Sequence, residues 1–262
     1  MKQFIKRQLF GKKRYQSLFS RCFDISLSGL NIGTGGQHPR HNGEIWALHN
    51  ALSKVSERDN LVIFDGGAQI GIYTQCVLDT LSDLNKNATV YGFEPGENEY
   101  QKYTEKFLGW KNVIPSHTAL NNKIGTVKLY APKNSTGLGS LYPSDRNKQN
   151  VNEAESITID QFCRDRNIKK IHLLKLDVEG NELNVLRGAE KMLENGSIDF
   201  IQFEFGICSL AAKISFRALY DILKSRYTIS RILTDGLEEI KNPGLREECF
   251  FTTNYLAEKK QT

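Results

Sequence analysis

The stretch LVIFDGGAQIGIYT, from Leu61 to Thr74, joins a short apolar run, one acid, a glycine cluster and a second apolar run. The first run has the length of a buried strand, and the residues after Gly71 space their apolar side chains as a helix does. Glycine between the two allows a tight turn, because it has no Cβ and tolerates positive φ. The same freedom would let a cofactor approach the backbone, so the stretch predicts either a simple connection or a binding turn.

Strand and helix patterns alternate along the chain after residue 59. Such alternation predicts a mainly parallel sheet with helices on both faces. The segment from Pro132 to Asn152 has no periodicity, and we expect a mobile loop there, either functional or simply disordered. Strands are expected at 60–64, 88–95, 112–120, 126–131, 168–177, 198–206, 227–233 and 249–258, and helices at 70–84, 97–109, 181–196 and 216–226.

Composition indicates an ordinary soluble protein. The chain has 262 residues, of which 39% are hydrophobic and 25% charged, and no apolar run reaches the roughly 18 residues of a membrane span. The start of the chain lacks the apolar core of a signal peptide. Five scattered cysteines without a CxxC pair favour reduced thiols in a cytoplasmic protein over a zinc site or a disulfide framework: Cys22, Cys76, Cys163, Cys208 and Cys249.

Positive charge is concentrated at the N-terminus. The first 21 residues hold seven Lys or Arg and no acid, so the remainder is near −2 in a chain of net charge +5. Apolar residues such as Phe4, Leu9 and Leu18 interleave with these charges. This arm is either a solvated or packed helix, or an interfacial helix attracted to an anionic surface such as the inner face of a membrane. We divide the chain into an extension at 1–59 and a main domain at 60–262.

Five acids fall at the predicted carboxyl ends of strands: Asp65, Glu94, Asp177, Glu179 and Glu204. In an open α/β sheet, ligands bind beyond those ends. One acid at a strand end is common, but five at the ends of four strands predict a functional site along this edge.

The turn does not match a dinucleotide-binding fingerprint. The GxGxxG pattern requires glycine where this chain has Ala68. The pattern is instead Asp65-x-Gly67-x-x-x-Gly71, and an acid at that point would repel a pyrophosphate but suits a cationic ligand. S-adenosylmethionine carries an ammonium and a sulfonium, and Glu94 on the next strand could accept both ribose hydroxyls.

Several segments resemble the FkbM family of S-adenosylmethionine-dependent methyltransferases. They are FDGGAQIGIYT, VYGFEP, ITIDQF, LLKLDVEGNELNVLRGAEKML and IDFIQFEFG, and the resemblance spans about 60–206. It implies a Rossmann-like class I methyltransferase fold, with a mainly parallel seven-stranded sheet and an antiparallel last strand. It also implies O-methylation, frequently of sugar hydroxyls in glycans or natural products. The cofactor residues expected from the turn and the resemblance are Asp65, Gly66, Gly67, Ala68, Gly71, Glu94, Pro95 and Ala119.

A sugar hydroxyl is a weak nucleophile, so methyl transfer benefits from a base within hydrogen-bond reach. Asp177 and Glu179 are the first candidates, and His117 and Glu204 the second. Alternatively, Asp177, Glu179 and Glu204 could hold a divalent metal such as Mg²⁺, which would lower the pKa of the hydroxyl.

Other residues near the predicted site have open roles. Glu182, and also Glu179, could instead cap the following helix. His38, Arg40 and His41 lie in a glycine-rich stretch and could contact the substrate, although exposed loop histidines are common.

Two alternatives stay open for the function. The acceptor could be another small molecule, a lipid or a protein, or the chain could bind S-adenosylmethionine without catalysis. Methylation of nucleic-acid bases is disfavoured, because the expected D/N-P-P-aromatic turn is replaced by DVEG at 177–180. No nucleic-acid partner is therefore predicted, and the oligomeric state is left open.

Overall fold

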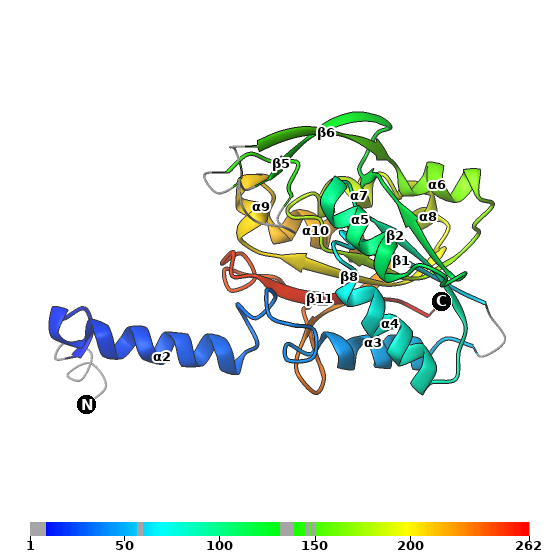
Figure 1. The fold of residues 1–262 in the computed structure, drawn as a ribbon. Helices are drawn as coiled ribbons and strands as arrows, with labels where there is room; N and C mark the ends of the chain where they lie inside the picture. Colours follow the sequence, from blue (N-terminus) through cyan, green and yellow to red (C-terminus); the bar gives the residue numbers. More distant parts are fainter. Residues whose placement is uncertain (1–8, 57–59, 132–138, 145–146, 148–149, 262) are drawn as a thin grey trace.

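A computed structural model describes residues 9–56, 60–131, 139–144, 147 and 150–261 of the chain. Its centre is an eight-stranded sheet in the order β10-β9-β11-β8-β7-β1-β2-β3 (Figure 1). Neighbours from β3 through β8 run parallel, whereas β11 is antiparallel to both β8 and β9. The strands are β1 (Leu61–Gly66), β2 (Ala88–Phe93), β3 (Val113–Ser116), β7 (Ile171–Leu176), β8 (Ile198–Phe205), β9 (Tyr227–Ile232), β10 (Leu237–Glu239) and β11 (Thr253–Lys259).

This topology confirms the predicted class I methyltransferase fold with its late antiparallel strand. Seven of the strands are the expected ones. The eighth, the edge strand β10, was not predicted, because a strand of three residues that pairs only with β9 is too short to show a pattern. Central strands are apolar runs because helices cover both of their faces, and every residue of β7 is buried.

Helices form two layers around the large sheet. Apolar side chains of α3, α4 and α5 pack with Leu61 and Ile63 in one cluster. Those of α6, α7, α8 and α10 pack with Phe64 and Leu174 in the other. The helices are η1 (Lys13–Tyr15), α2 (Gln16–Gly29), α3 (Glu44–Ser53), α4 (Ile72–Asp83), α5 (Glu97–Lys106), α6 (Ile159–Asp165), α7 (Glu182–Arg187), α8 (Glu190–Glu194), α9 (Ile207–Ala211) and α10 (Phe216–Leu223).

A second, three-stranded sheet has the order β4-β6-β5 and lies above the helices in Figure 1. It comprises β4 (Ala119–Leu120), β5 (Gly125–Ala131) and β6 (Asn150–Ile157). The single strand expected at 112–120 is therefore wrong: β3 joins the large sheet and β4 the small one. The expected mobile loop at 132–152 falls partly on 132–138, 145–146 and 148–149, which lie outside the described residues. Its end is not a loop, because β6 begins at Asn150.

The single helix expected at 181–196 is also wrong, since α7 ends at Arg187 and α8 begins at Glu190. A Cβ on Gly188 would lie 2.1 Å from the carbonyl oxygen of Asn121, so the chain passes very close to a neighbouring loop there. The carboxylate of Asp160 then accepts the N–H groups of Lys191 and Met192 and caps the new helix start. A contact from α6 thus sets the break, and the local periodicity could not reveal it.

The N-terminal region has two differently placed parts. Helix α2 projects from the body (Figure 1), and none of its residues is buried. Helix α3 instead buries Ala47, Leu48, Ala51 and Leu52 against the sheet. Residues 44–55 therefore share the core of the main body, and the division at 59/60 stays a prediction. No helix in the described ranges combines the length and apolarity needed to cross a membrane.

Candidate active site

The turn after β1 packs against the end of β7. Gly67 has φ +80°, and a Cβ there would lie 1.9 Å from the carbonyl oxygen of Asp177. Gly71 begins α4 with φ +78°, and its Cβ would lie 2.3 Å from Cε2 of Phe107. Both positions require glycine for backbone geometry and for space. The turn is consequently a tight connection, and it also leaves Gly67 exposed to the cavities described below.

Asp65 lies beneath this turn. Its carboxylate is buried and accepts a 2.6 Å hydrogen bond from Thr74 Oγ1. Burial raises the pKa of Asp65 to about 6, although the Thr74 hydrogen bond opposes the rise. Asp65 is not among the residues that line the two cavities of this edge. Its predicted contact with the cofactor ammonium stays a prediction.

Glu94 ties the ends of β1 and β2 together. Its Oε2 accepts the N–H of Gln69 at 2.9 Å, and its Oε1 accepts the N–H of Gly96 at 2.7 Å. Burial raises its pKa to about 7 in spite of these two hydrogen bonds. The carboxylate is therefore held in a fixed position at the carboxyl end of β2.

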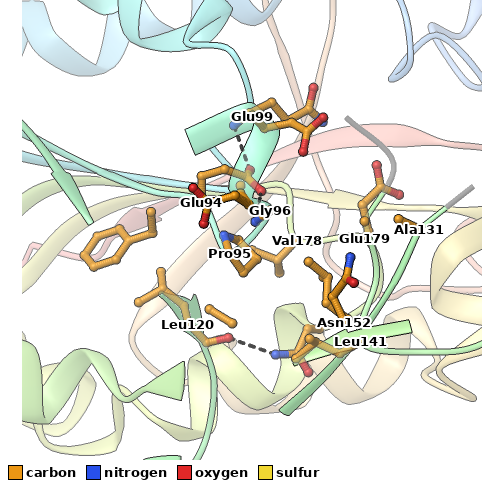
Figure 2. A pocket seen from close by; sticks show the side chains of 18 of the residues that line it. Glu94, Pro95, Gly96, Glu99, Leu120, Ala131, Leu141, Asn152, Val178 and Glu179 are labelled. Atoms are coloured by element: carbon orange, nitrogen blue, oxygen red, sulfur yellow. Dashed lines mark hydrogen bonds between the residues drawn. The ribbon is translucent and has the colours of Figure 1, made fainter. Parts of the chain in front are cut away.

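Glu94 lines a cavity that we call the Glu94 cavity (Figure 2). Its walls come from the ends of β1, β2 and β7 and from the small sheet, and Figure 2 shows Glu94 and Glu179 around the same space. Residues of this cavity include Gly67, Glu94, Pro95, Ala119, Leu129, Asn152, Asp177, Val178 and Glu179. Four residues predicted to bind the cofactor are thus together in one cavity: Gly67, Glu94, Pro95 and Ala119.

A second cavity, which we call the Glu204 cavity, lies on the other side of the β7 end. Its walls bring together segments that are far apart in the sequence. They include Gly35, Gln37, His38, Glu44, Ala68, Ile72, Tyr73, Lys175, Glu204, Cys208 and Thr252. Gly67, Gln69, Asp177 and Glu179 line both cavities. The two spaces therefore meet at the end of β7.

Asp177 and Glu179 occupy this junction. The N–H of Asp177 donates to the carbonyl of Gly66 at 3.0 Å, which extends the β1–β7 pairing. Glu179 has φ +52°, and its Oε2 accepts from Cys208 Sγ at 2.8 Å. Burial, and next the charge of Asp177, raise the pKa of Glu179 to about 7. One junction carboxyl group thus changes its protonation state near neutral pH.

Glu204 ends β8 and faces only the second cavity. Burial, followed by the charge of Asp177, raises its pKa well above the usual range. Gly35 packs on it closely, since a Cβ there would lie 2.9 Å from Glu204 Oε1. The segment before α3 therefore closes over this carboxyl group.

A buried polar network supports the junction from below. Lys175 Nζ lies 3.3 Å from Asp177 Oδ2 and 3.5 Å from Glu44 Oε2. Glu44 also accepts 2.7 Å hydrogen bonds from the side-chain amides of Asn42, Gln202 and Asn254. Burial alone would lower the pKa of Lys175, but the two carboxylates outweigh it and raise that pKa. The network holds a positive charge next to Asp177.

Sequence reasoning missed this network. Lys175 interrupts the otherwise apolar run LLKL at the end of β7, and a charged residue at a buried strand position was the available signal. Nothing in the sequence pairs it with Glu44, because that contact arises only when α3 packs on the sheet.

Other predicted residues separate in space. His38 lines the Glu204 cavity, whereas Arg40 and His41 line a different depression next to Trp46. Arg40 also pairs with Asp79 at 3.0 Å on the exposed surface. His117 stacks on Tyr100 with ring centroids 4.5 Å apart and lines neither cavity. Its catalytic role stays a prediction without geometric support.

The structure also bears on the role of Glu182 and on the candidate metal ligands. Glu182 is buried, and its Oε1 accepts the N–H groups of Val178 and Gly180, so it closes the turn before α7. In the described part of the chain, no three His, Cys, Asp or Glu side chains group in a way that could hold a metal ion. The conditional metal set of Asp177, Glu179 and Glu204 stays a prediction, and no step below uses a metal.

Comparison with known proteins agrees with this architecture. Residues 65–225 match the family model described as "Methyltransferase FkbM domain". The chain belongs to the FkbM methyltransferase family. The matched span contains the glycine turn, Glu94 and the whole β7–β8 region, so the resemblance noted from the sequence is confirmed and the chain is a methyltransferase.

One curated relative is the hexuronic acid methyltransferase AglP of Haloferax volcanii. It is 25% identical over 174 residues, which cover 63% of this chain and 68% of that protein. Among solved structures, the plantazolicin methyltransferase BpumL in complex with SAH aligns with a TM-score of 0.44 and 12% identity, over 94% of this chain and 93% of that one. Fibrillarin of Aeropyrum pernix with bound S-adenosyl-L-methionine aligns with a TM-score of 0.43 and 11% identity, over 81% and 73%.

Proposed function

We propose that this protein transfers a methyl group from S-adenosylmethionine to a hydroxyl group of a sugar in a glycan or a glycosylated metabolite. The observation that carries the proposal is the junction at the end of β7, where the Glu94 cavity and the Glu204 cavity share Asp177 and Glu179. Two adjoining spaces with carboxylates between them suit a donor, an acceptor and a base.

The residues that line the Glu94 cavity suit the cofactor. Each oxygen of the buried Glu94 carboxylate accepts one backbone N–H and has a further lone pair. These remaining lone pairs can accept hydrogen bonds from both ribose hydroxyls. Gly67 presents bare backbone where any side chain would collide with Asp177. When bound, S-adenosylmethionine supplies a methyl group already activated by its sulfonium, so the protein mainly has to align that methyl with an oxygen.

The junction carboxylates act on the acceptor hydroxyl. Lys175, which also pairs with Glu44, lies 3.3 Å from the Asp177 carboxylate and holds a positive charge beside it. Glu179 has a pKa close to neutral, which is the range in which a general base works best. Either carboxylate then accepts the hydroxyl proton as the oxygen–methyl bond forms and the sulfur–methyl bond would break, which would leave S-adenosylhomocysteine as the neutral thioether. The proton stays on that carboxyl group until solvent removes it.

A sugar acceptor is favoured by two observations. The Glu204 cavity is lined by hydrogen-bonding groups of His38, Gln37, Tyr73, Glu204 and Thr252, and a polyhydroxylated ligand can pair with many of them. The relative AglP is named for methylation of a hexuronic acid. The proposal extends that substrate class to this chain as a sugar, without specifying which one.

The test is a product analysis. The protein is incubated with methyl-labelled S-adenosylmethionine and a panel of glycans, nucleotide-sugars, lipids and peptides, and products are followed by mass spectrometry. The proposal expects S-adenosylhomocysteine release coupled to a label on a sugar oxygen, and transfer slowed by about 10²–10⁴-fold in the Asp177→Asn variant. Label found only on a lipid or peptide would contradict the sugar assignment, and cofactor binding without transfer to any acceptor would leave a non-catalytic binding protein.

A further inference from the structure

The outer side of α3 forms one wall of a depression that the chemistry described above does not use. We call it the Trp46 depression, and its volume of about 530 Å³ falls in the roughly 300–1,000 Å³ range of small-molecule sites. Its lining comes from the segment before α3, from residues of α3 at the three- and four-residue spacing of one helix side, and from the turn after β9. These three parts supply Pro39 and His41, then Trp46, His49 and Asn50, and finally Thr234.

The walls of this depression are fixed to one another by backbone contacts. Gly43, at the start of α3, has φ +91°, and a Cβ there would lie 2.1 Å from the carbonyl oxygen of Leu233. The buried amide of Asn31 donates to the carbonyls of Asn42 at 2.8 Å and of Ile232 at 2.9 Å. The start of α3 and the turn after β9 are therefore tied together, so the depression is formed before any ligand binds.

Several polar side chains of the Trp46 depression are available to a ligand. Among the described residues, no hydrogen bond engages the side chains of His41, His49 or Asn50, and the buried Nδ2 of Asn50 has no partner. Because nothing fixes this amide, it can turn toward a ligand oxygen and recover the missing hydrogen bond. Trp46 adds a partly buried aromatic side chain. A sugar ring suits this lining, since it offers hydroxyls to the polar groups and an apolar C–H face to the aromatic one.

The Trp46 depression is continuous with the Glu204 cavity. Pro39 lines both of them. The ring of His38, in the cavity, has its centroid 6.1 Å from that of His41, in the depression. The Glu204 cavity has a volume of about 740 Å³, so each space is large enough for a ligand of its own. A chain of linked sugars can therefore extend from one space into the other along residues 38–41.

We propose that the Trp46 depression is a second sugar subsite, which binds a neighbouring residue of the same glycan whose reacting hydroxyl lies in the Glu204 cavity. This inference rests on the proposed function and narrows the acceptor to an oligosaccharide. His41, His49 and Asn50 hydrogen-bond the second sugar, whereas Arg40 is engaged by Asp79. Contacts so far from the junction are equal in the ground state and the transition state, so they lower the KM for longer acceptors and leave kcat unchanged.

The experiment uses a glycan array in which each chain type is present from the single sugar up to the hexasaccharide. Binding is measured with S-adenosylhomocysteine, and kcat and KM for methyl transfer with labelled S-adenosylmethionine. The variant His41→Ala/His49→Ala truncates two exposed side chains of the depression. The matched control Lys102→Ala/Glu105→Ala truncates two exposed side chains of α5 that line neither the depression nor the two cavities.

The parent is expected to bind oligosaccharides more tightly than the matching single sugar. The variant should raise the KM for oligosaccharides by about tenfold, the value of two neutral hydrogen bonds, and leave kcat and the KM for the single sugar within about twofold. The control should match the parent in every measurement, and thermal melts of both variants should match it too.

The outcomes separate this subsite from the proposed function. Sugar methylation with the same KM for single sugars and oligosaccharides, or with a parent-like KM in the variant, would overturn the subsite and leave the proposed function standing. Oligosaccharide binding that the variant loses, without methyl transfer to any sugar, would support the subsite and overturn the proposed function. No binding and no transfer with any member of the array would overturn both.

Discussion

The Glu94 cavity and the Glu204 cavity meet at one strand end but are built in different ways. The first takes Gly67 and Glu94 from one βαβ unit, and these residues stand in short recognisable motifs. The second takes Gly35, Glu44, Glu204 and Thr252 from segments spread over nearly the whole chain. A local motif can thus fix where one substrate binds, whereas the space for the other depends on how distant segments pack.

This difference predicts that variants in the two cavities and at their junction will affect cofactor binding, methyl transfer and acceptor binding separately. The largest effect is expected at the junction. Asp177→Asn keeps the size of the side chain but removes its charge, so methyl transfer should slow by about 10²–10⁴-fold, the range typical of a positioned base. Affinity for S-adenosylmethionine should stay within about twofold, a difference of roughly 0.4 kcal/mol. Single-turnover rates and calorimetry measure the two quantities.

Asp235→Asn is a matched control for that variant, because Asp235 is exposed and lines neither cavity. Transfer at the parent rate by Asp177→Asn, with acceptor at saturation, would remove Asp177 from the chemistry. The base would then have to be Glu179 or Glu204.

The next effect is expected in the Glu94 cavity. Glu94→Gln should weaken S-adenosylmethionine binding by about tenfold or more, because a hydrogen bond to a charged group contributes roughly 1.5–3 kcal/mol. The transfer rate at saturating cofactor should change little. Glu99→Gln alters another carboxylate of the same cavity and should bind the cofactor normally. Parent-like affinity in a folded Glu94→Gln variant would place the ribose elsewhere.

The pH dependence of S-adenosylmethionine binding also tests the role of Glu94. Burial raises the pKa of Glu94 to about 7, and the ionised form accepts the ribose hydroxyls better than the protonated form. Affinity for S-adenosylmethionine should therefore be greatest above pH 7 and fall as pH decreases through 7, by up to about tenfold between pH 8 and pH 6. Calorimetry of Glu94→Gln should show a flatter profile. A parent affinity that is constant over this range would separate Glu94 from cofactor binding.

The smallest effects concern the acceptor side. His38→Ala should raise the KM for the acceptor by roughly two- to tenfold, the value of a neutral hydrogen bond, with kcat little changed. Arg40→Ala should stay within about twofold of the parent, because its exposed pair with Asp79 contributes little and it lines another depression. Steady-state kinetics compare them directly. If Arg40→Ala had the larger effect on KM, the Glu204 cavity would not be the acceptor site.

The sequence predicted the sheet and the Glu94 cavity well for a physical reason. Strand runs, the glycine turn and the acids at strand ends are local patterns, and parallel strands bring their carboxyl ends to one edge. The same patterns correctly placed Asp177 and Glu179 at that edge. They could not show that the Asp65 side chain is buried below the glycine turn, where it accepts a hydrogen bond from Thr74. The direction of that side chain depends on packing, which the local pattern does not contain.

The features that the sequence did not predict depend on contacts between distant segments. The Lys175–Glu44 pair requires α3 to pack on the large sheet. The break between α7 and α8 requires Asp160 from α6 as a cap. The division of His38 from Arg40 requires the segment around Gly35 to close over Glu204. Each of these is a tertiary contact, and no periodicity or motif in one segment contains the information.

A crystal structure of the protein with S-adenosylhomocysteine tests the central claim most directly. The account predicts that the ribose hydroxyls lie within hydrogen-bond distance of Glu94 and that the sulfur points toward the junction of Asp177 and Glu179, with the Glu204 cavity open beyond it. A ligand whose sulfur points away from that junction, or that lies outside the Glu94 cavity, would contradict it.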